Sequence, residues 1–418
     1  MRFWKKLGPG LITGSSDDDP SGIATYSQAG AAFGLTTLWT ALITFPLMAA
    51  IQEMCGRIGL VTAQGLTGTL KAHYPRAVLY LMLLFSFPAI VINIGADIAG
   101  MGAVGHLLFP TIHPTFFSVL FTLILLISMI YFPYQKIAAV LKYLCIVLFV
   151  YLFIPFLYKQ DWWQIIKSTI IPSISLNKEF LAILVGILGT TISPYLFFWQ
   201  ATMEVEELKQ KQKKKQLMVN KKIISEMKKD VDIGMLFSNI VMFFIILTTG
   251  TVLFNAGIHK IDTVEQAAEA LKPLAGNSAY ILFAAGVIGT GLLAIPVLSG
   301  SLSHIFCETF GWKEGLDNKF NEARPFYTII AISLLLGLSL SYIGISPVKA
   351  LLYSAILYGL TAPVLIAIIL HICNNKKVMG QFTNSKKSNF FGIAALILMS
   401  FAAIALIYFQ LTEIQTSK

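Results

Sequence analysis

Long apolar stretches separated by short polar connections run along almost the whole chain. Each is about 20 residues long, so a helix rising 1.5 Å per residue could cross a hydrocarbon core about 30 Å thick. We therefore predict an all-α membrane protein with eleven transmembrane helices. They cover residues 8–33, 36–57, 77–105, 115–132, 136–157, 180–202, 231–255, 276–307, 325–342, 347–373 and 389–411.

Two of these spans are interrupted. The first contains the run Asp18-Asp19-Pro20-Ser21-Gly22, and the sixth contains Gly189-Thr190-Thr191-Ile192-Ser193-Pro194. Proline removes a backbone donor and clashes with the preceding turn, so each run should unwind its helix. One such break could be a simple kink. Two breaks, each in the first helix of a five-helix half, favour an inverted-repeat transporter whose binding site lies at the interface of the repeats.

Composition and charge support a membrane protein. Hydrophobic residues make up 56% of the chain and charged residues 12%, which excludes a soluble globule of 418 residues. The net charge of +10 falls mainly on alternate connections, above all on the lysine-rich loop 203–230. The positive-inside rule then predicts a multi-pass protein of the plasma (inner) membrane, with a cytosolic N-terminus and an external C-terminus. The loop is either a solvated linker or a contact for anionic lipids.

The breaks offer oxygen ligands for a cation. Asp19 lies at the first break, and an ionisable group at that depth should face a partner or a water-filled path. The second break offers the carbonyls of Thr190 and Thr191, and the hydroxyls of both threonines and of Ser193. Such ligands suit hard ions such as Mg²⁺, Mn²⁺ or Ca²⁺. Asp18 is a further candidate, although successive helical residues point about 100° apart.

Other polar residues in the spans have two interpretations each. Asn93 and Asp97 share a helix face and could line the ion pathway or bond a neighbouring helix. Glu53 could cap a helix or pair with Arg57. A membrane enzyme that binds diphosphate through its aspartates would need a second acidic cluster, which the sequence lacks, as it lacks HExxH and GxSxG motifs. We therefore expect neither an enzyme nor a bound cofactor.

The sequence around the breaks resembles the Nramp family of divalent metal transporters. The first span is similar to the family pattern GPG…DPGN-x-AT-x-x-QAG-x-x-FG, and two later segments are similar to its KLGIVTG and TDLAE stretches. The matching residues are Gly8-Pro9-Gly10, Asp19-Pro20-Ser21-Gly22, Ala24-Thr25, Gln28-Ala29-Gly30, Phe33-Gly34, Ile58-Gly59-Leu60-Val61-Thr62 and Ala96-Asp97-Ile98-Ala99.

The chain departs from this pattern at informative positions. Gly22 stands where the family has the asparagine of DPGN, and Ser193-Pro194-Tyr195 stands where it has MPH. Gly100 replaces a glutamate of the third helix, and the ninth span has no interior arginine. In the family those charged groups belong to the proton route. The combination resembles the branch of Nramp-related magnesium transporters, which carry Mg²⁺ and also Mn²⁺.

The resemblance implies a LeuT-type 5+5 inverted repeat with broken helices one and six. The repeats would be 1–158 and 159–373, followed by an eleventh helix and tail in 374–418. It also implies uptake of Mg²⁺ and Mn²⁺ by alternating access without proton coupling. The rivals are a proton-coupled Mn²⁺ or Fe²⁺ carrier and an organic-substrate permease. The expected partners are the ion and the lipid bilayer, with a monomer sufficient and no nucleic acid.

The resemblance also assigns roles to single residues. Asp19 would be the carboxylate ligand and Thr190 the carbonyl ligand, while Ser193 and Gly22 replace the methionine and asparagine ligands. Both replacements enlarge the site and remove soft or bulky groups, as expected for an ion that keeps part of its hydration shell. The full prediction comprises the metal residues Asp19, Gly22, Thr190, Ser193 and Asp18, and the pathway residues Asn93, Asp97, Thr191 and Tyr195.

Overall fold

A computed structural model describes residues 8–132, 150–157, 160–212, 218–316 and 318–416. Its described part is a bundle of helices, and seven of these are long and apolar enough to cross a membrane. The predicted spans are confirmed wherever the chain is described, whereas most of the span 136–157 lies outside the described residues. The unbroken long helices are α3 (Trp39–Thr62), α5 (Arg76–Leu108), α6 (Pro114–Tyr131), α12 (Lys221–Val252), α15 (Ala279–Phe310), α16 (Arg324–Leu340), α17 (Pro347–Asn374) and α19 (Lys386–Thr416).

Both predicted interruptions are present. The first span divides into α1 (Pro9–Asp17) and α2 (Pro20–Phe33), and the sixth into α10 (Lys178–Thr191) and α11 (Pro194–Gln212). In each case a proline opens the second half, a position where its missing N–H costs no hydrogen bond. Two residues therefore separate the halves of each broken helix.

Several helix ends differ from the prediction. Helix α11 continues to Gln212 and α12 begins at Lys221, so both extend into the polar loop. Lysine, glutamate and glutamine are good helix formers, and a helix can continue where its apolar stretch has ended. Short helices also form in the connections: α4 (Leu66–His73), α8 (Val150–Phe153), η2 (Ile154–Leu157), α9 (Trp162–Ile170), α13 (Val264–Glu269), α14 (Lys272–Ala275), η3 (Gly276–Ser278), α18 (Lys376–Met379) and η4 (Gly380–Phe382).

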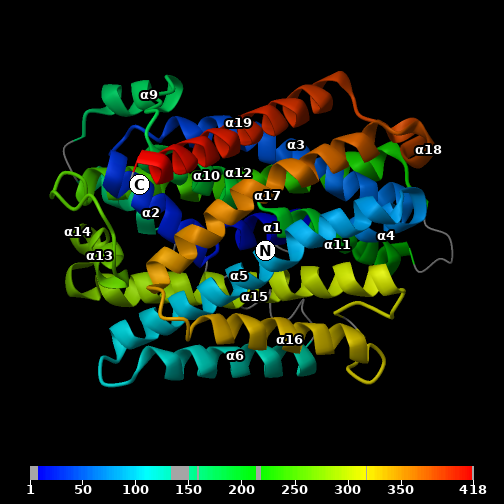
Figure 1. The fold of residues 1–418 in the computed structure, drawn as a ribbon, viewed down its shortest axis with the longest axis horizontal. Helices are drawn as coiled ribbons and strands as arrows, with labels where there is room; N and C mark the ends of the chain where they lie inside the picture. Colours follow the sequence, from blue (N-terminus) through cyan, green and yellow to red (C-terminus); the bar gives the residue numbers. More distant parts are fainter. Residues whose placement is uncertain (1–7, 133–149, 158–159, 213–217, 317, 417–418) are drawn as a thin grey trace.

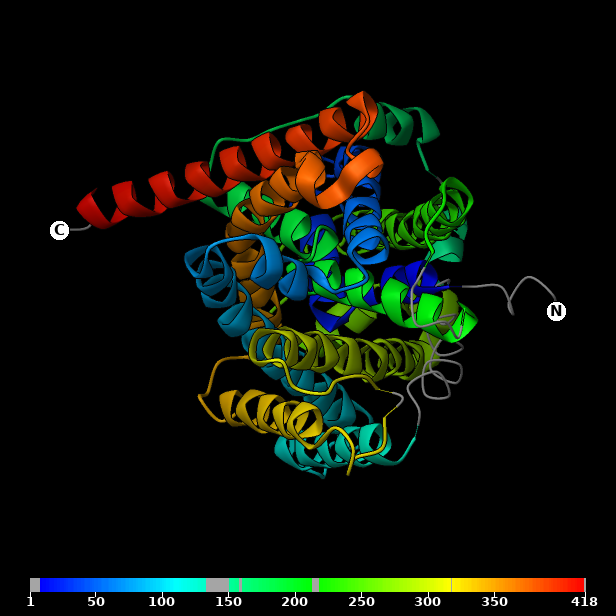
Figure 2. The same ribbon diagram turned by 90° about the vertical axis from the view of Figure 1, so that its right-hand side faces the viewer.

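The two broken helices occupy the centre of the bundle. Helices α1 and α2 pack against α12, α10 packs against α17, and α11 packs against α3. Helices α6 and α16 run along one edge of the molecule and α19 along the other (Figure 1). Seen from the end that carries the connections 63–75, 311–323 and 375–385, hereafter the basic end, the long helices surround this core (Figure 2). The unwound backbone is thereby shielded from lipid.

Glycine permits the closest of these helix contacts. Gly14 of α1 faces the backbone of Gly234 in α12, and a β-carbon at Gly14 would collide with the Gly234 carbonyl. Gly10, one turn earlier, lies against the backbone of Val231. Small residues let helix backbones approach closely in membranes, where dispersion contacts rather than the hydrophobic effect hold helices together. This contact fixes the position of α1, and with it the position of the first break.

Candidate functional site

Asp19 occupies the first break and caps α2. Its backbone is extended (φ −68°, ψ 172°), and Pro20 follows as the first helical residue. The carboxylate oxygen Oδ1 accepts hydrogen bonds from the Gly22 N–H at 2.8 Å and the Ser21 hydroxyl at 2.6 Å. An aspartate at this position satisfies N–H groups that have no partner within the helix. The break therefore fixes the direction of the Asp19 side chain.

A second set of contacts joins Asp19 to α5 and α17. The Asn93 amide donates to Asp19 Oδ2 at 2.9 Å, and the Asn93 carbonyl oxygen accepts from the Ser354 hydroxyl at 2.8 Å. The Asn93 side chain thus bonds both the Asp19 carboxylate and the neighbouring helix α17. Ser354 was not predicted, because an isolated serine in an apolar helix has no signal that separates it from a packing residue.

The second break exposes carbonyls that its own serine partly covers. Helix α10 ends at Thr191, and the Ser193 hydroxyl contacts the carbonyl oxygens of Thr190 and, at 3.3 Å, Gly189. Thr190, Thr191 and Ser193 are all buried. The hydroxyl of Thr191 also lies 3.5 Å from the sulfur of Met242 in α12, a contact that the sequence did not predict.

The two breaks lie side by side. A β-carbon built on Gly22 would lie 3.2 Å from the Thr190 hydroxyl oxygen, so Gly22 leaves open the space next to that residue. The Tyr26 hydroxyl lies 3.0 Å from the Thr191 hydroxyl, and the Tyr195 hydroxyl donates to the Ser16 carbonyl at 2.7 Å. The two broken helices therefore meet at Gly22 and Thr190, at Tyr26 and Thr191, and at Ser16 and Tyr195.

Three further aspartates are buried around Asp19. Asp97 lies one turn beyond Asn93 on α5, close enough to Asp19 for the two charges to interact. Its carboxylate lies near the Ser21 N–H, but neither oxygen makes a hydrogen bond of normal geometry within the described residues. Asp17 and Asp18 contact Ser238 of α12 instead. All four side chains are at most 1% exposed. We call Asp17, Asp18, Asp19 and Asp97 the central acids.

Little empty space remains at the breaks. A cavity of about 20 Å³, enough for about one water molecule, lies beside Pro20 and Gly100 and is lined otherwise by apolar side chains. Gly100 stands where a glutamate occurs in the family pattern, so the cavity carries no acid. Among the described residues, no three histidine, cysteine, aspartate or glutamate side chains converge in a metal-binding group. A cation at the breaks would therefore need carbonyl, hydroxyl or water oxygens beside its carboxylates.

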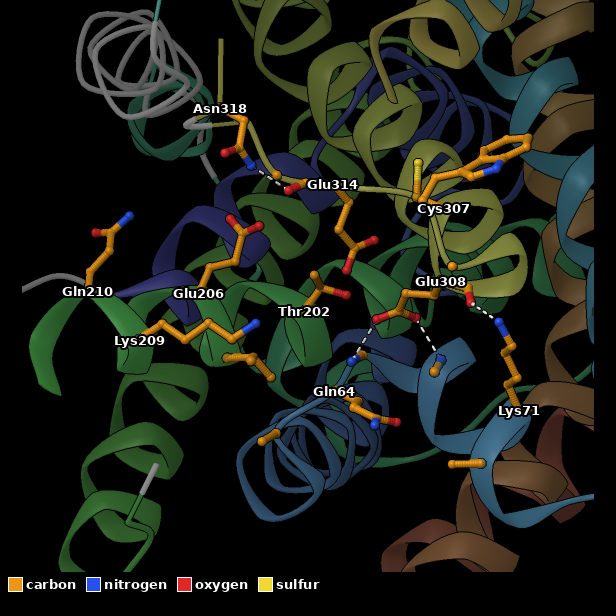
Figure 3. Close-up of a pocket in the computed structure, with 18 residues that line it drawn as sticks. Gln64, Lys71, Thr202, Glu206, Lys209, Gln210, Cys307, Glu308, Glu314 and Asn318 are labelled. Atoms are coloured by element: carbon orange, nitrogen blue, oxygen red, sulfur yellow. Dashed lines mark hydrogen bonds between the residues drawn. The ribbon is translucent and has the colours of Figure 1, made fainter. Parts of the chain in front are cut away.

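A much larger cavity, of about 790 Å³, opens at the basic end (Figure 3). Its lining includes Glu206 of α11, Glu308 of α15 and Glu314 of the following loop. Glu308 accepts from the N–H groups of Gly65 and Gly68 at 2.7 and 2.8 Å, and so caps α4. This cavity shares no lining residue with the breaks, and sequence patterns did not predict it because its walls come from three separate connections.

The chain matches one family model over nearly its whole length. The model is described as natural resistance-associated macrophage protein-like (Nramp) and matches residues 10–409. Among similar proteins, one named divalent metal cation transporter MntH from Caldanaerobacter subterraneus is 25% identical over 399 residues, which is 94% of this chain and 90% of that protein. Another of the same name from Clostridium acetobutylicum is 26% identical over 411 residues, covering 98% and 91%.

Solved structures share the fold at lower sequence identity. A manganese transporter of Eremococcus coleocola aligns with a TM-score of 0.73 and 20% identity, covering 97% of this chain and 87% of that chain. Mhp1, a nucleobase-cation-symport-1 family transporter, aligns with a TM-score of 0.58 and 12% identity, covering 96% and 92%. Both likenesses extend over nearly the entire chain, so this chain shares the fold of these two structures.

Proposed function

The chain belongs to the Nramp family, and from this premise we propose that it carries Mg²⁺, and also Mn²⁺, through the two breaks without coupled proton movement. Membership makes it a divalent metal cation transporter rather than an enzyme. The proposal adds the ion, the ligands and the absence of proton coupling. One observation supports it: the first break holds the buried Asp19 carboxylate, and Gly22 of the same break lies against Thr190 of a second break that is rich in neutral oxygen.

The proposed ligands are hard oxygen atoms. Asp19 supplies charge, while Thr190 supplies a carbonyl that the Ser193 hydroxyl contacts and can release. Gly22 supplies space rather than an atom, which suits an ion that retains some waters. We do not propose Asp18 as a ligand of this ion, because its carboxylate contacts Ser238 of α12 rather than α5.

The pathway residues would then have distinct roles. Asn93 orients Asp19, and Asp97 provides a second carboxylate one turn away. Thr191 and Tyr195 hold the breaks together through Tyr26 and Ser16, so their bonds must change when the halves of the broken helices separate. Because the central acids are sealed, the described conformation would be an occluded state of alternating access.

Two positions argue against proton coupling of the usual kind in this family. Gly100 cannot carry a proton, and it lines the small apolar cavity beside Pro20. Helix α16 spans Arg324–Leu340, and its only basic residue is the first one, at the end of the helix. A titratable chain from Asp97 would therefore lack its next member on α5. We expect no acidification of the lumen when metal enters proteoliposomes, and robust metal-driven proton flux would contradict this part of the proposal.

Uptake into proteoliposomes tests the ion site directly. Asp19→Asn keeps the size of the side chain but removes its charge, so we expect Mg²⁺ and Mn²⁺ uptake to fall at least about 100-fold, the effect of losing a charged ligand worth about 3 kcal/mol. Asp262→Asn is the matched control. Asp262 pairs with Lys260 in an exposed connection at the end of the bundle opposite the basic end. Unchanged uptake by the Asp19 variant would refute the assigned site.

The metal selectivity of variants that gain or lose a methionine at the second break gives a second test. If oxygen ligands select the ion, Ser193→Met should favour Cd²⁺ over Mg²⁺, because a thioether prefers softer metals. Met242 already lies against Thr191, so Met242→Leu checks whether existing sulfur contributes. We expect Met242→Leu to leave the Cd²⁺-to-Mg²⁺ uptake ratio unchanged. A collapse of Mn²⁺ uptake in that variant would favour the rival manganese carrier with a soft ligand.

Orientation and oligomeric state also remain proposals. We propose the inner membrane, a cytosolic basic end and an external C-terminus, with the monomer as the transporting unit. Asp262→Cys and Lys376→Cys place thiols on exposed connections at opposite ends of the bundle, and Cys55, Cys307 and Cys373 are buried. An impermeant maleimide added to intact cells should label position 262 and not position 376. The reverse pattern would invert the topology.

A further inference from the structure

Asp17 and Asp18 turn toward a different helix from Asp19. The Ser238 hydroxyl of α12 lies 2.6 Å from Asp17 Oδ2 and 3.3 Å from Asp18 Oδ1, whereas Asp19 bonds to Asn93 of α5. Asp17, Asp18 and Ser238 are completely buried. Two carboxylates thus converge on one hydroxyl, on the side of the first break that faces α12.

This pair lacks the partners that buried carboxylates need. Asp17 Oδ1 and Asp18 Oδ2 are buried and accept no hydrogen bond from any residue that the structure describes. Ser238 has a single proton to donate, so it can satisfy only one of the two carboxylates at a time. Among the ion pairs of the described residues, none involves Asp17 or Asp18. A buried carboxylate has to be paired, protonated or bound to a cation, and a bound cation is the alternative that a binding measurement can detect.

About two turns earlier on α12, an acid that contacts the start of α1 has a partner for each of its oxygens. Asp230 of α12 accepts from the N–H of Gly8 at 3.1 Å and from the N–H of Gly10 at 2.7 Å, so both of its oxygens have partners where α1 begins. Helix α12 therefore satisfies its acidic contact at the start of α1. At the end of α1 it provides one hydroxyl for two carboxylates and leaves two oxygens open.

We propose that Asp17 Oδ1, Asp18 Oδ2 and the Ser238 hydroxyl form a second hard-cation site, separate from the ion at Asp19. Two carboxylates balance one divalent charge, and the free carbonyls at the C-terminus of α1 add favourable negative potential. This proposal depends on the proposed function in one respect, because a transported ion has to be able to reach the site. Its occupant is a hard cation, either a second divalent ion or Na⁺, since both bind carboxylate and hydroxyl oxygen.

Equilibrium dialysis of the full-length protein in detergent tests this site. We would measure bound ⁵⁴Mn²⁺ in choline chloride and bound ²²Na⁺ in separate arms. If the second ion is divalent, wild type should bind two Mn²⁺ per chain, and D17N/D18N and D19N should each bind one. If it is sodium, wild type should bind one Mn²⁺ and one Na⁺, and D17N/D18N should lose only the Na⁺. Asp230→Asn is the matched control and should bind as wild type does.

The outcomes separate this site from the transport site. If D17N/D18N binds as many Mn²⁺ and Na⁺ ions as wild type, the second site does not exist, whatever D19N does. If D17N/D18N loses one ion and D19N loses none, the second site stands and the proposed transport site fails. Should D17N/D18N aggregate, Ser238→Ala replaces it. We expect that variant to bind the second ion about tenfold more weakly, and unchanged affinity would overturn the proposal.

Discussion

Two regions of this molecule contain acidic side chains that are buried or partly buried, and the partners of these acids differ between the regions. At the basic end, Glu53 pairs with Arg57 at 2.8 and 3.1 Å, Glu308 receives two backbone N–H groups, and Glu314 contacts His304 at 3.2 Å. At the membrane centre, Asp97 and one oxygen each of Asp17 and Asp18 have no partner among the described residues.

Asp17, Asp18 and Asp97 thus differ from the acids of the basic end in keeping oxygens open for a ligand, whereas Asp19 accepts from Ser21, Gly22 and Asn93. A paired carboxylate contributes to folding, because removing it leaves its partner buried and uncompensated. An unpaired buried carboxylate lowers stability, and it persists only where function requires it. The four predictions below test this contrast by comparing the stability of the protein with its transport, in order of decreasing expected effect.

The largest effect on stability should come from the paired region. Glu53→Ala leaves Arg57, whose side chain is 6% exposed, without its carboxylate, so we expect a loss of about 3–5 kcal/mol. Thermal unfolding in detergent would measure it, while Mn²⁺ affinity of the folded fraction should not change. The double variant Glu53→Gln/Arg57→Met should recover part of the loss. Full stability in Glu53→Ala would show that this ion pair is not structural.

The next largest effect should be on transport rather than on stability. Asp97→Asn removes an unpaired buried charge, so we expect unchanged or higher thermal stability, together with a fall in Mn²⁺ uptake of about tenfold, equivalent to about 1.4 kcal/mol. Uptake and unfolding would be measured on the same preparation. If Asp97→Asn destabilises the protein as Glu53→Ala does, the contrast between the two regions is wrong.

A smaller effect is expected at the large cavity. Glu308→Gln keeps one acceptor oxygen but removes the negative charge at the start of α4, so stability should fall by about 1 kcal/mol. Uptake of Mg²⁺ at saturating concentration should stay within twofold of wild type. A loss of transport comparable to that of the Asp97 variant would instead place this cavity on the ion pathway.

The smallest effect should come from an exposed pair. Asp262 lies 3.0 Å from Lys260, and both side chains are largely accessible to solvent. Asp262→Asn should change the unfolding free energy by less than about 1 kcal/mol, because exposed ion pairs contribute little. Uptake should equal that of wild type. Any marked change in transport would show that charge outside the membrane centre affects ion entry.

Much of the fold could be predicted from local sequence. Apolar stretches of sufficient length determined the long helices, because lipid requires each backbone polar group to bond within its own segment. Pro20 and Pro194 determined both breaks, since proline cannot continue the hydrogen-bond ladder. The same local rules placed Asp19 at the first break. They could not place the helix ends in the polar loop 203–230, because there the helix propensity of the residues, rather than the lipid, determines where each helix ends.

Part of the site was decided only by tertiary structure. Asn93 and Ser238 come from helices far from Asp19 along the chain, and only packing brings them onto the central acids, while Ser354 bonds in turn to Asn93. A lone polar residue in an apolar helix looks the same whether it faces a neighbouring helix or an ion. Which carboxylate oxygens stay open is also invisible in the sequence, since it depends on hydrogen bonds made across helices. The sequence by itself determined where the backbone opens, because that is a local property of proline and lipid; the contact between the two openings, and the partners of each acid, required the folded bundle.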